Sequence, residues 1–89
     1  MLREAAERIR RHLGVHLVQL RIEENRVIVN VFIAERLKPG ELEETIIAAK
    51  DSSLIYLTAY ANLNLKLVKE ESECSQEGCL IKLVFKIVS

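Results

Sequence analysis

Two cysteines and two histidines are the side chains in this sequence best suited to metal binding or nucleophilic chemistry. Cys74 and Cys79 are separated by Ser-Gln-Glu-Gly, and His12 and His16 lie about sixty residues earlier. A structural zinc site usually needs four Cys or His ligands in closely spaced pairs. A single, loosely spaced cysteine pair does not meet that need, so we expect neither a metal nor another cofactor.

The cysteine pair leaves two interpretations open. A Cys74–Cys79 disulfide could close the loop between the last two expected strands, because the ends of a hairpin bring such positions together. Intracellular disulfides are expected mainly in hyperthermophiles. The abundance of Glu, Lys and Arg and the scarcity of Met, Gln, Gly and Pro hint at thermophily. Two reduced thiols are the default interpretation, and the disulfide is the alternative.

The histidines flank Gly14, and no local motif gives either of them a catalytic partner. A catalytic histidine needs a nucleophile or an orienting carboxylate placed by the fold. The chain contains no phosphate-binding glycine loop, paired-carboxylate motif or Gly-x-Ser-x-Gly sequence. We therefore interpret His12 and His16 as ordinary packing or surface residues. A small enzyme whose site assembles across a dimer interface, with one of these histidines, is a fainter alternative.

The first thirteen residues concentrate positive charge that could contact phosphate groups. They hold two glutamates and four arginines: Arg3, Arg8, Arg10 and Arg11. The whole chain is neutral, with 13 basic and 13 acidic residues, whereas a nucleic-acid binder normally concentrates more positive charge on one surface. A solvated helix face with internal ion pairs is the favoured interpretation. Nucleic-acid binding by this basic helix is the runner-up.

The periodicity of apolar residues predicts the elements that would position these side chains. Residues 2–13 form an amphipathic helix that ends at Gly14. Alternating residues then predict a hairpin of strands 15–23 and 26–34, in which Asn25 supplies the left-handed conformation of a tight turn.

A second helix is expected from about Glu41, with a soft spot at Asp51-Ser52-Ser53. The sequence leaves open whether the helix is continuous there, is kinked, or starts a new segment capped by Asp51. Strands over residues 63–67 and 81–87 follow, separated by an acidic loop over residues 70–78. The order α-β-β-α-β-β predicts one α+β domain, a two-layer sandwich. Its antiparallel four-stranded sheet carries both helices on one face.

The second helix and the first hairpin carry more apolar surface than one sheet face can cover. Surplus apolar surface on a small domain usually indicates a partner subunit. We therefore expect a non-enzymatic interaction or scaffold module, either a homodimer or a small subunit of a larger complex. The candidate interface residues are Leu17, Ile28, Phe32, Ile47, Leu54, Ile55 and Ala61.

The element order, with Gly14-Val15 after the first helix, resembles the opening of Roadblock/LC7 domains. The resemblance covers residues 2–88 as a pattern. It implies a small cytoplasmic dimerisation module of the kind associated with small GTPases and motor complexes. The sequence departs from that pattern at Glu24-Asn25, where an Asp-Gly turn is expected, and at the fifth strand, which would follow Ser89. No functional residue is carried over from the family.

The sequence also predicts a location. No basic stretch leads into an apolar segment at the N-terminus, so no secretory signal is visible. The longest run without a charged residue, 52–65, is too short to span a bilayer. We therefore expect a cytoplasmic protein with no membrane partner.

Overall fold

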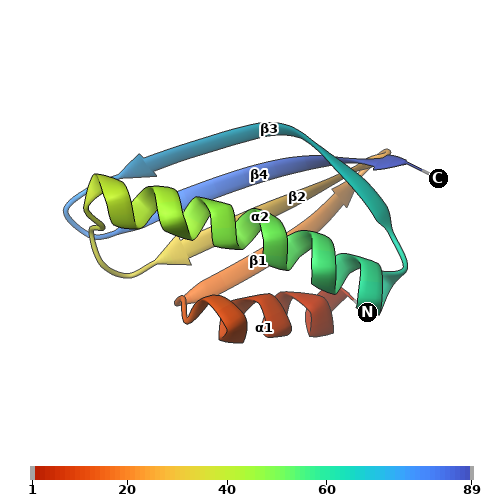
Figure 1. Cartoon of the computed structure of the whole chain (residues 1–89), viewed down its shortest axis with the longest axis horizontal. Coiled ribbons are helices and arrows are strands. Elements are labelled where there is room, and N and C mark those ends of the chain that lie inside the picture. Colours follow the sequence, from red (N-terminus) through yellow and green to blue (C-terminus); the bar gives the residue numbers. More distant parts are fainter. Residues whose placement is uncertain (1, 89) are drawn as a thin grey trace.

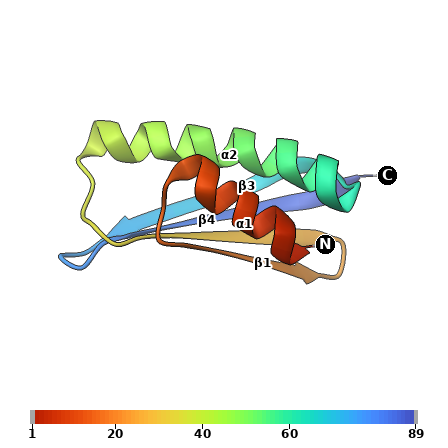
Figure 2. The same ribbon diagram turned by 90° about the horizontal axis from the view of Figure 1, so that it is seen from below.

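The computed structural model describes residues 2–88. Six elements follow one another: α1 (Leu2–Leu13), β1 (Leu17–Glu23), β2 (Arg26–Ile33), α2 (Pro39–Ala61), β3 (Asn64–Cys74) and β4 (Cys79–Val88). The strands form one antiparallel sheet in the order β1-β2-β4-β3. Both helices lie on the same face of it (Figures 1 and 2). The two-layer α+β architecture predicted from the sequence is confirmed.

Each helix is bounded by local signals in the sequence. At the end of α1, Gly14 has a left-handed φ of 67° and its N–H donates to the Arg10 carbonyl at 2.9 Å. Pro39 occupies the first turn of α2, where its missing N–H costs nothing. The Glu41 carboxylate accepts the Lys38 N–H at 3.0 Å. The helix therefore begins two residues before the expected start. It ends at Ala61, and Asn62 caps it in the left-handed conformation.

The sequence left open whether the second helix is continuous, and the structure has a single helix from Pro39 to Ala61. At the soft spot, the Ser52 hydroxyl donates to the Ala48 carbonyl at 2.7 Å, so it turns back onto its own helix. Ser52 and Ser53 are both buried. Among the described residues, no helix is long and apolar enough to cross a membrane.

The core lies between the helices and the inner face of the sheet. The two central strands, β2 and β4, supply most of it, because their inward residues are β-branched or large and lie under both helices. The fully buried members from these strands are Val27, Val29, Val31, Ile81, Leu83 and Phe85. Ile9 of α1 and Ala49 and Leu57 of α2 pack against them with no exposed surface.

Two local predictions are wrong. The acidic segment expected as a loop over residues 70–78 is mostly strand, because β3 pairs with β4 as far as Cys74, after a bulge between Leu67 and Lys69. Charged side chains are tolerated on such an edge strand, where one side faces solvent. In the first hairpin, Glu24 rather than Asn25 has the positive φ, 56°.

Candidate functional site

The sheet face opposite the helices is uncovered (Figure 2). Strand register aligns its outward side chains in rows across the sheet. The row beside the β3–β4 turn, which we call the apolar end, contains Leu17, Phe32, Leu80 and Glu73. The row at the opposite end, which we call the basic end, contains Glu23, Arg26, Lys86 and Lys66. The two rows between them contain Gln19, Asn30, Lys82 and Glu71, and then Arg21, Ile28, Val84 and Lys69.

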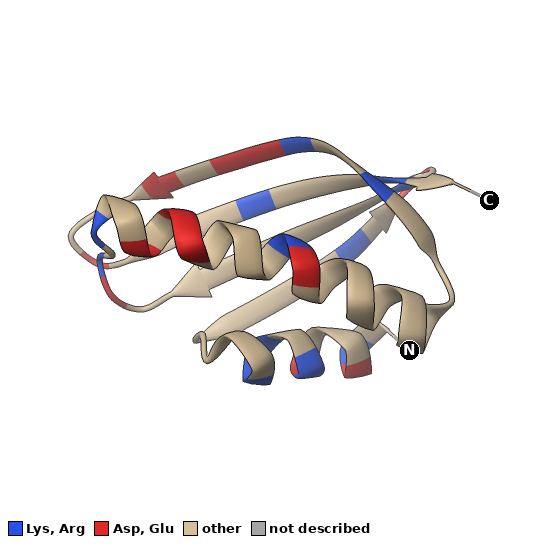
Figure 3. Ribbon diagram, in the orientation of Figure 1, with Lys and Arg blue, Asp and Glu red and all other residues tan. Residues whose placement is uncertain are grey.

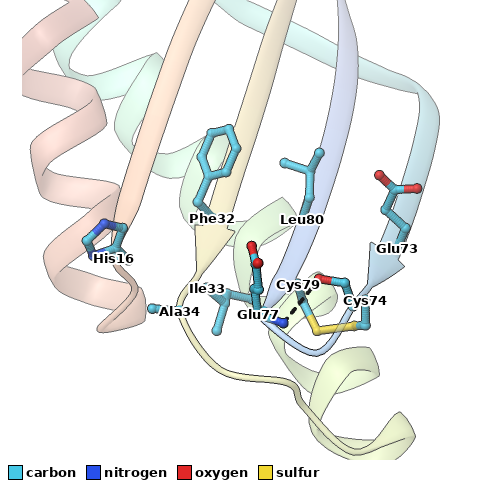
Figure 4. Close-up of a pocket in the computed structure, with 11 residues that line it drawn as sticks. His16, Phe32, Ile33, Ala34, Glu73, Cys74, Glu77, Cys79 and Leu80 are labelled. Carbon is cyan, nitrogen blue, oxygen red and sulfur yellow. Dashed lines mark hydrogen bonds between the residues drawn. A yellow bond between two sulfur atoms is a disulfide. The ribbon is translucent and has the colours of Figure 1, made fainter.

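A shallow hollow of about 520 Å³ lies at the apolar end. Phe32 and Leu80 supply its apolar wall, and the Cys74–Cys79 disulfide lies at its rim (Figure 4). Glu77 reaches from the turn toward Phe32 and Leu80 (Figure 4). The hollow therefore combines apolar walls with charged groups at its edges.

His16 lines this hollow, whereas His12 lies on α1 with its ring edge-on to Tyr56, 5.8 Å between centroids. Both histidines are exposed. In the described part of the chain, no hydrogen bond or ion pair joins His16 to Glu73 or Glu77, which share the hollow. The hollow thus brings an imidazole and carboxylates into one neighbourhood without forming a catalytic pair.

The two cysteines are disulfide-bonded, where the sequence favoured two reduced thiols. The β3–β4 register places Cys74 directly opposite Cys79, with Cα atoms 4.1 Å apart. Within residues 2–88, no group of three or more His, Cys, Asp or Glu side chains is placed to hold a metal ion. The disulfide also removes the thiolates that such a site would need.

Gly78 shapes the turn that carries the disulfide. Its φ is 157°, and a Cβ added there would overlap the carbonyl oxygen of Ile33. The turn therefore packs directly on the end of β2, at a distance that only glycine permits. This contact fixes the position of Glu77 and the disulfide relative to the open face.

Most cations at the basic end have no carboxylate within ion-pair distance among the described residues. Glu23 pairs with Arg21 at 3.2 Å. Arg26, Lys66 and Lys86 make no ion pair with any residue that the structure describes. Ribbon colouring by charge shows basic residues on all four strands (Figure 3). Sequence reasoning missed this cluster, because its members become neighbours only through strand register. The signal in the sequence is weak: six of the eleven polar positions in the four rows are Lys or Arg.

The arginines of α1 are differently placed from those at the basic end. Glu7 pairs with Arg10 at 2.7 Å and with Arg11 at 3.1 Å. The hydrogen bond from Arg10 and its charge hold the pKa of Glu7 at about 2, with a smaller contribution from Arg11. Arg8 lies over the Tyr60 ring, 5.6 Å from its centroid, and Arg3 lines a hollow beside β1. The candidate phosphate contacts are thus largely engaged within the protein.

The candidate interface residues separate onto two surfaces. Leu17, Ile28 and Phe32 lie on the open face, where Leu17 is exposed, Phe32 is half-buried and Ile28 is only 6% exposed. The others lie on α2, across the molecule. Ile47, Leu54 and Ile55 are 51%, 36% and 60% exposed, whereas Ala61 packs against the core. One interface cannot include both surfaces of a single subunit.

Comparison with protein-family models finds no match, and comparison with curated proteins finds no similar sequence. The similarity to Roadblock/LC7 domains therefore stays a prediction from element order.

Proposed function

We propose that this protein is a non-enzymatic interaction module that assembles with a second copy of itself through the outer stripe of α2. The observation that carries the proposal is the exposure of Ile47, Leu54 and Ile55 on one helix. The segment 52–65 contains no charged residue. The C-terminal half of α2 is apolar on nearly all sides, and such a helix is normally buried on nearly all sides. Only the sheet and α1 pack against it, so Leu54 and Ile55 stay exposed.

A second copy suits this surface because a two-fold axis would bring the exposed apolar residues of α2 against their own equivalents. At 1.5 Å per residue, the exposed residues from Ile47 to Ile55 span about 12 Å along α2. Two such helices can pack across a two-fold axis, the commonest symmetry of protein dimers. A specific interface buries about 800 Å² per subunit, which is about a seventh of the 5802 Å² surface of this chain.

The proposal is tested by replacing Ile47 and Ile55 with lysine in one variant. These two side chains are more than half exposed, so the substitutions leave the core intact and the variant should fold. We expect light scattering to give a dimer mass for the native chain and a monomer mass for the variant. Two buried charges per subunit are costly in an apolar interface.

The matched control is Leu17→Lys, a substitution of an equally apolar residue, 39% exposed, on the opposite side of the molecule. This control should remain a dimer. A native chain that is monomeric at high micromolar concentration would refute the proposal. So would dissociation by Leu17→Lys with no effect of the α2 substitutions, because the interface would then lie on the open face.

A further inference from the structure

Three cations lie side by side at the basic end of the open face. The register places Lys86 of β4 directly opposite both Arg26 of β2 and Lys66 of β3. Adjacent strands are about 4.8 Å apart, so the row spans about 10 Å. All three side chains are exposed. Like charges directly opposite one another destabilise a sheet, so the Lys86–Arg26 and Lys86–Lys66 neighbours cost stability. Glu23 stands opposite Arg26 at the end of the row and offsets one of the three charges.

The surrounding charges do not cancel the row. The outward positions of the four strands hold six cations and three carboxylates, Glu23, Glu71 and Glu73. Glu71 already pairs with Lys69 at 3.0 Å, as Glu23 does with Arg21. Glu73 lies at the apolar end, three rows away from the cations. The open face is therefore positive at one end, although the whole chain is neutral.

The rest of the face offers groups suited to nucleobases. Asn30 and Gln19, neighbours in the next-to-apolar row, can donate and accept hydrogen bonds at base edges. Phe32 presents a half-buried ring at the apolar end, and aromatic rings on protein surfaces stack with bases of any sequence. Three row spacings of about 6.7 Å separate the basic end from Phe32, a span of about 20 Å that suits a short oligonucleotide.

We propose that the open sheet face binds single-stranded nucleic acid, with its phosphates on Arg26, Lys86 and Lys66 and its bases toward Asn30 and Phe32. A single strand fits better than a duplex, because its bases are free to reach the polar and aromatic side chains of a flat sheet. The surface lies opposite the α2 stripe, so binding does not depend on the proposed dimer. Arg8, Arg10 and Arg11 of α1 lie outside it, whereas Arg3 lines a hollow that includes Gln19 and Asn30.

The test measures the fluorescence anisotropy of a labelled single-stranded RNA or DNA of about ten nucleotides at several salt concentrations. The sheet variant is Arg26→Gln with Lys86→Gln. The control is Arg8→Gln with Arg11→Gln, which removes the same charge from exposed positions of α1. We expect the sheet variant to lose at least tenfold in affinity. The slope of log affinity against log salt concentration should become shallower by about 1.4. Each phosphate contact on a single strand contributes about 0.7 to that slope, and the variant removes two. The control should bind nearly as the native chain does.

A second readout separates ligand binding from loss of structure. Without nucleic acid, Lys86→Gln should raise the thermal midpoint, because it removes repulsion within the row. Adding the oligonucleotide should raise the midpoint of the native chain more than that of the sheet variant. Equal losses in the two double variants, or no binding at low salt, would overturn the proposal. Tighter binding to a duplex, or to phosphatidylserine vesicles, than to the single strand would overturn it as well.

Discussion

Glu24 occupies a backbone conformation that suits glycine better than any side chain. It is the first of two residues between Glu23 and Arg26, which pair across the β1–β2 hairpin. Its φ is 56°, in the left-handed region, whereas Asn25 does not have a positive φ. In a two-residue turn with positive φ at the first position alone, glycine is strongly preferred there. The sequence pointed to Asn25, because its side chain tolerates the left-handed region better than that of glutamate.

Glu24→Gly should therefore stabilise the protein by about 0.5–1 kcal/mol. The substitution removes the cost of a left-handed non-glycine residue, and this gain exceeds the loss that comes from the greater freedom of glycine in the unfolded chain. The measurement is the free energy of unfolding from urea denaturation. Asn25→Gly is the matched control: it adds the same freedom without relieving strain, so it should destabilise. If Asn25→Gly raised the free energy of unfolding and Glu24→Gly did not, the left-handed residue would be Asn25.

At the scale of elements, α2 stays helical through two serines that disfavour a helix interior. Ser52 and Ser53 are both buried, but only Ser52 has a hydrogen-bond partner, the Ala48 carbonyl. The Ser53 hydroxyl has no partner among the described residues. A buried polar group without a partner costs about 1–3 kcal/mol. The helix continues because its apolar neighbours, including Ala49 and Leu57, are fully buried against the sheet.

Ser53→Ala should stabilise the protein by about 1 kcal/mol, because it removes the unpaired hydroxyl and raises helix propensity. Ser52→Ala, one position away, should be close to neutral, because it loses a hydrogen bond while gaining propensity. Urea denaturation of the two variants under identical conditions gives the comparison. A destabilised Ser53→Ala variant would indicate that the hydroxyl has a partner.

The elements themselves were largely predictable, because apolar periodicity is a local property of the sequence. Helix α1, the first hairpin and β4 were predicted within a few residues. The far half of β3 was not, because Glu70, Glu71 and Glu73 lack an apolar alternation. Their strand conformation depends on pairing with β4, a partner later in the chain. The basic end was missed for the same reason: Arg26, Lys66 and Lys86 become neighbours only through the register of three strands.

For the whole molecule, the two-layer fold separates two surfaces that have different chemistry. The helical side carries Ile47, Leu54 and Ile55 on α2, with the exposed Asp51 on the same face of the helix. The open sheet face, on the other side of the sheet (Figure 2), carries the apolar and basic ends. A dimer through α2 would leave both sheet faces uncovered and directed away from the interface. Two open faces in one assembly could bind one longer strand of nucleic acid, with the higher apparent affinity that linked sites provide.

The stability of the whole domain should depend modestly on the disulfide and not on a metal. The Cys74–Cys79 bond closes a loop of six residues, for which chain entropy predicts at most about 2 kcal/mol. The same turn is also held by the Ser75 N–H, which donates to the Gly78 carbonyl at 2.8 Å. A thiol reductant should therefore lower the thermal midpoint while the domain remains folded at room temperature. A strong chelator should leave the midpoint unchanged. Thiol titration of the unfolded, unreduced chain should detect no free cysteine. Detection of two free thiols would show that the cysteines are reduced. Unfolding by the chelator with release of zinc would show that they bind a metal.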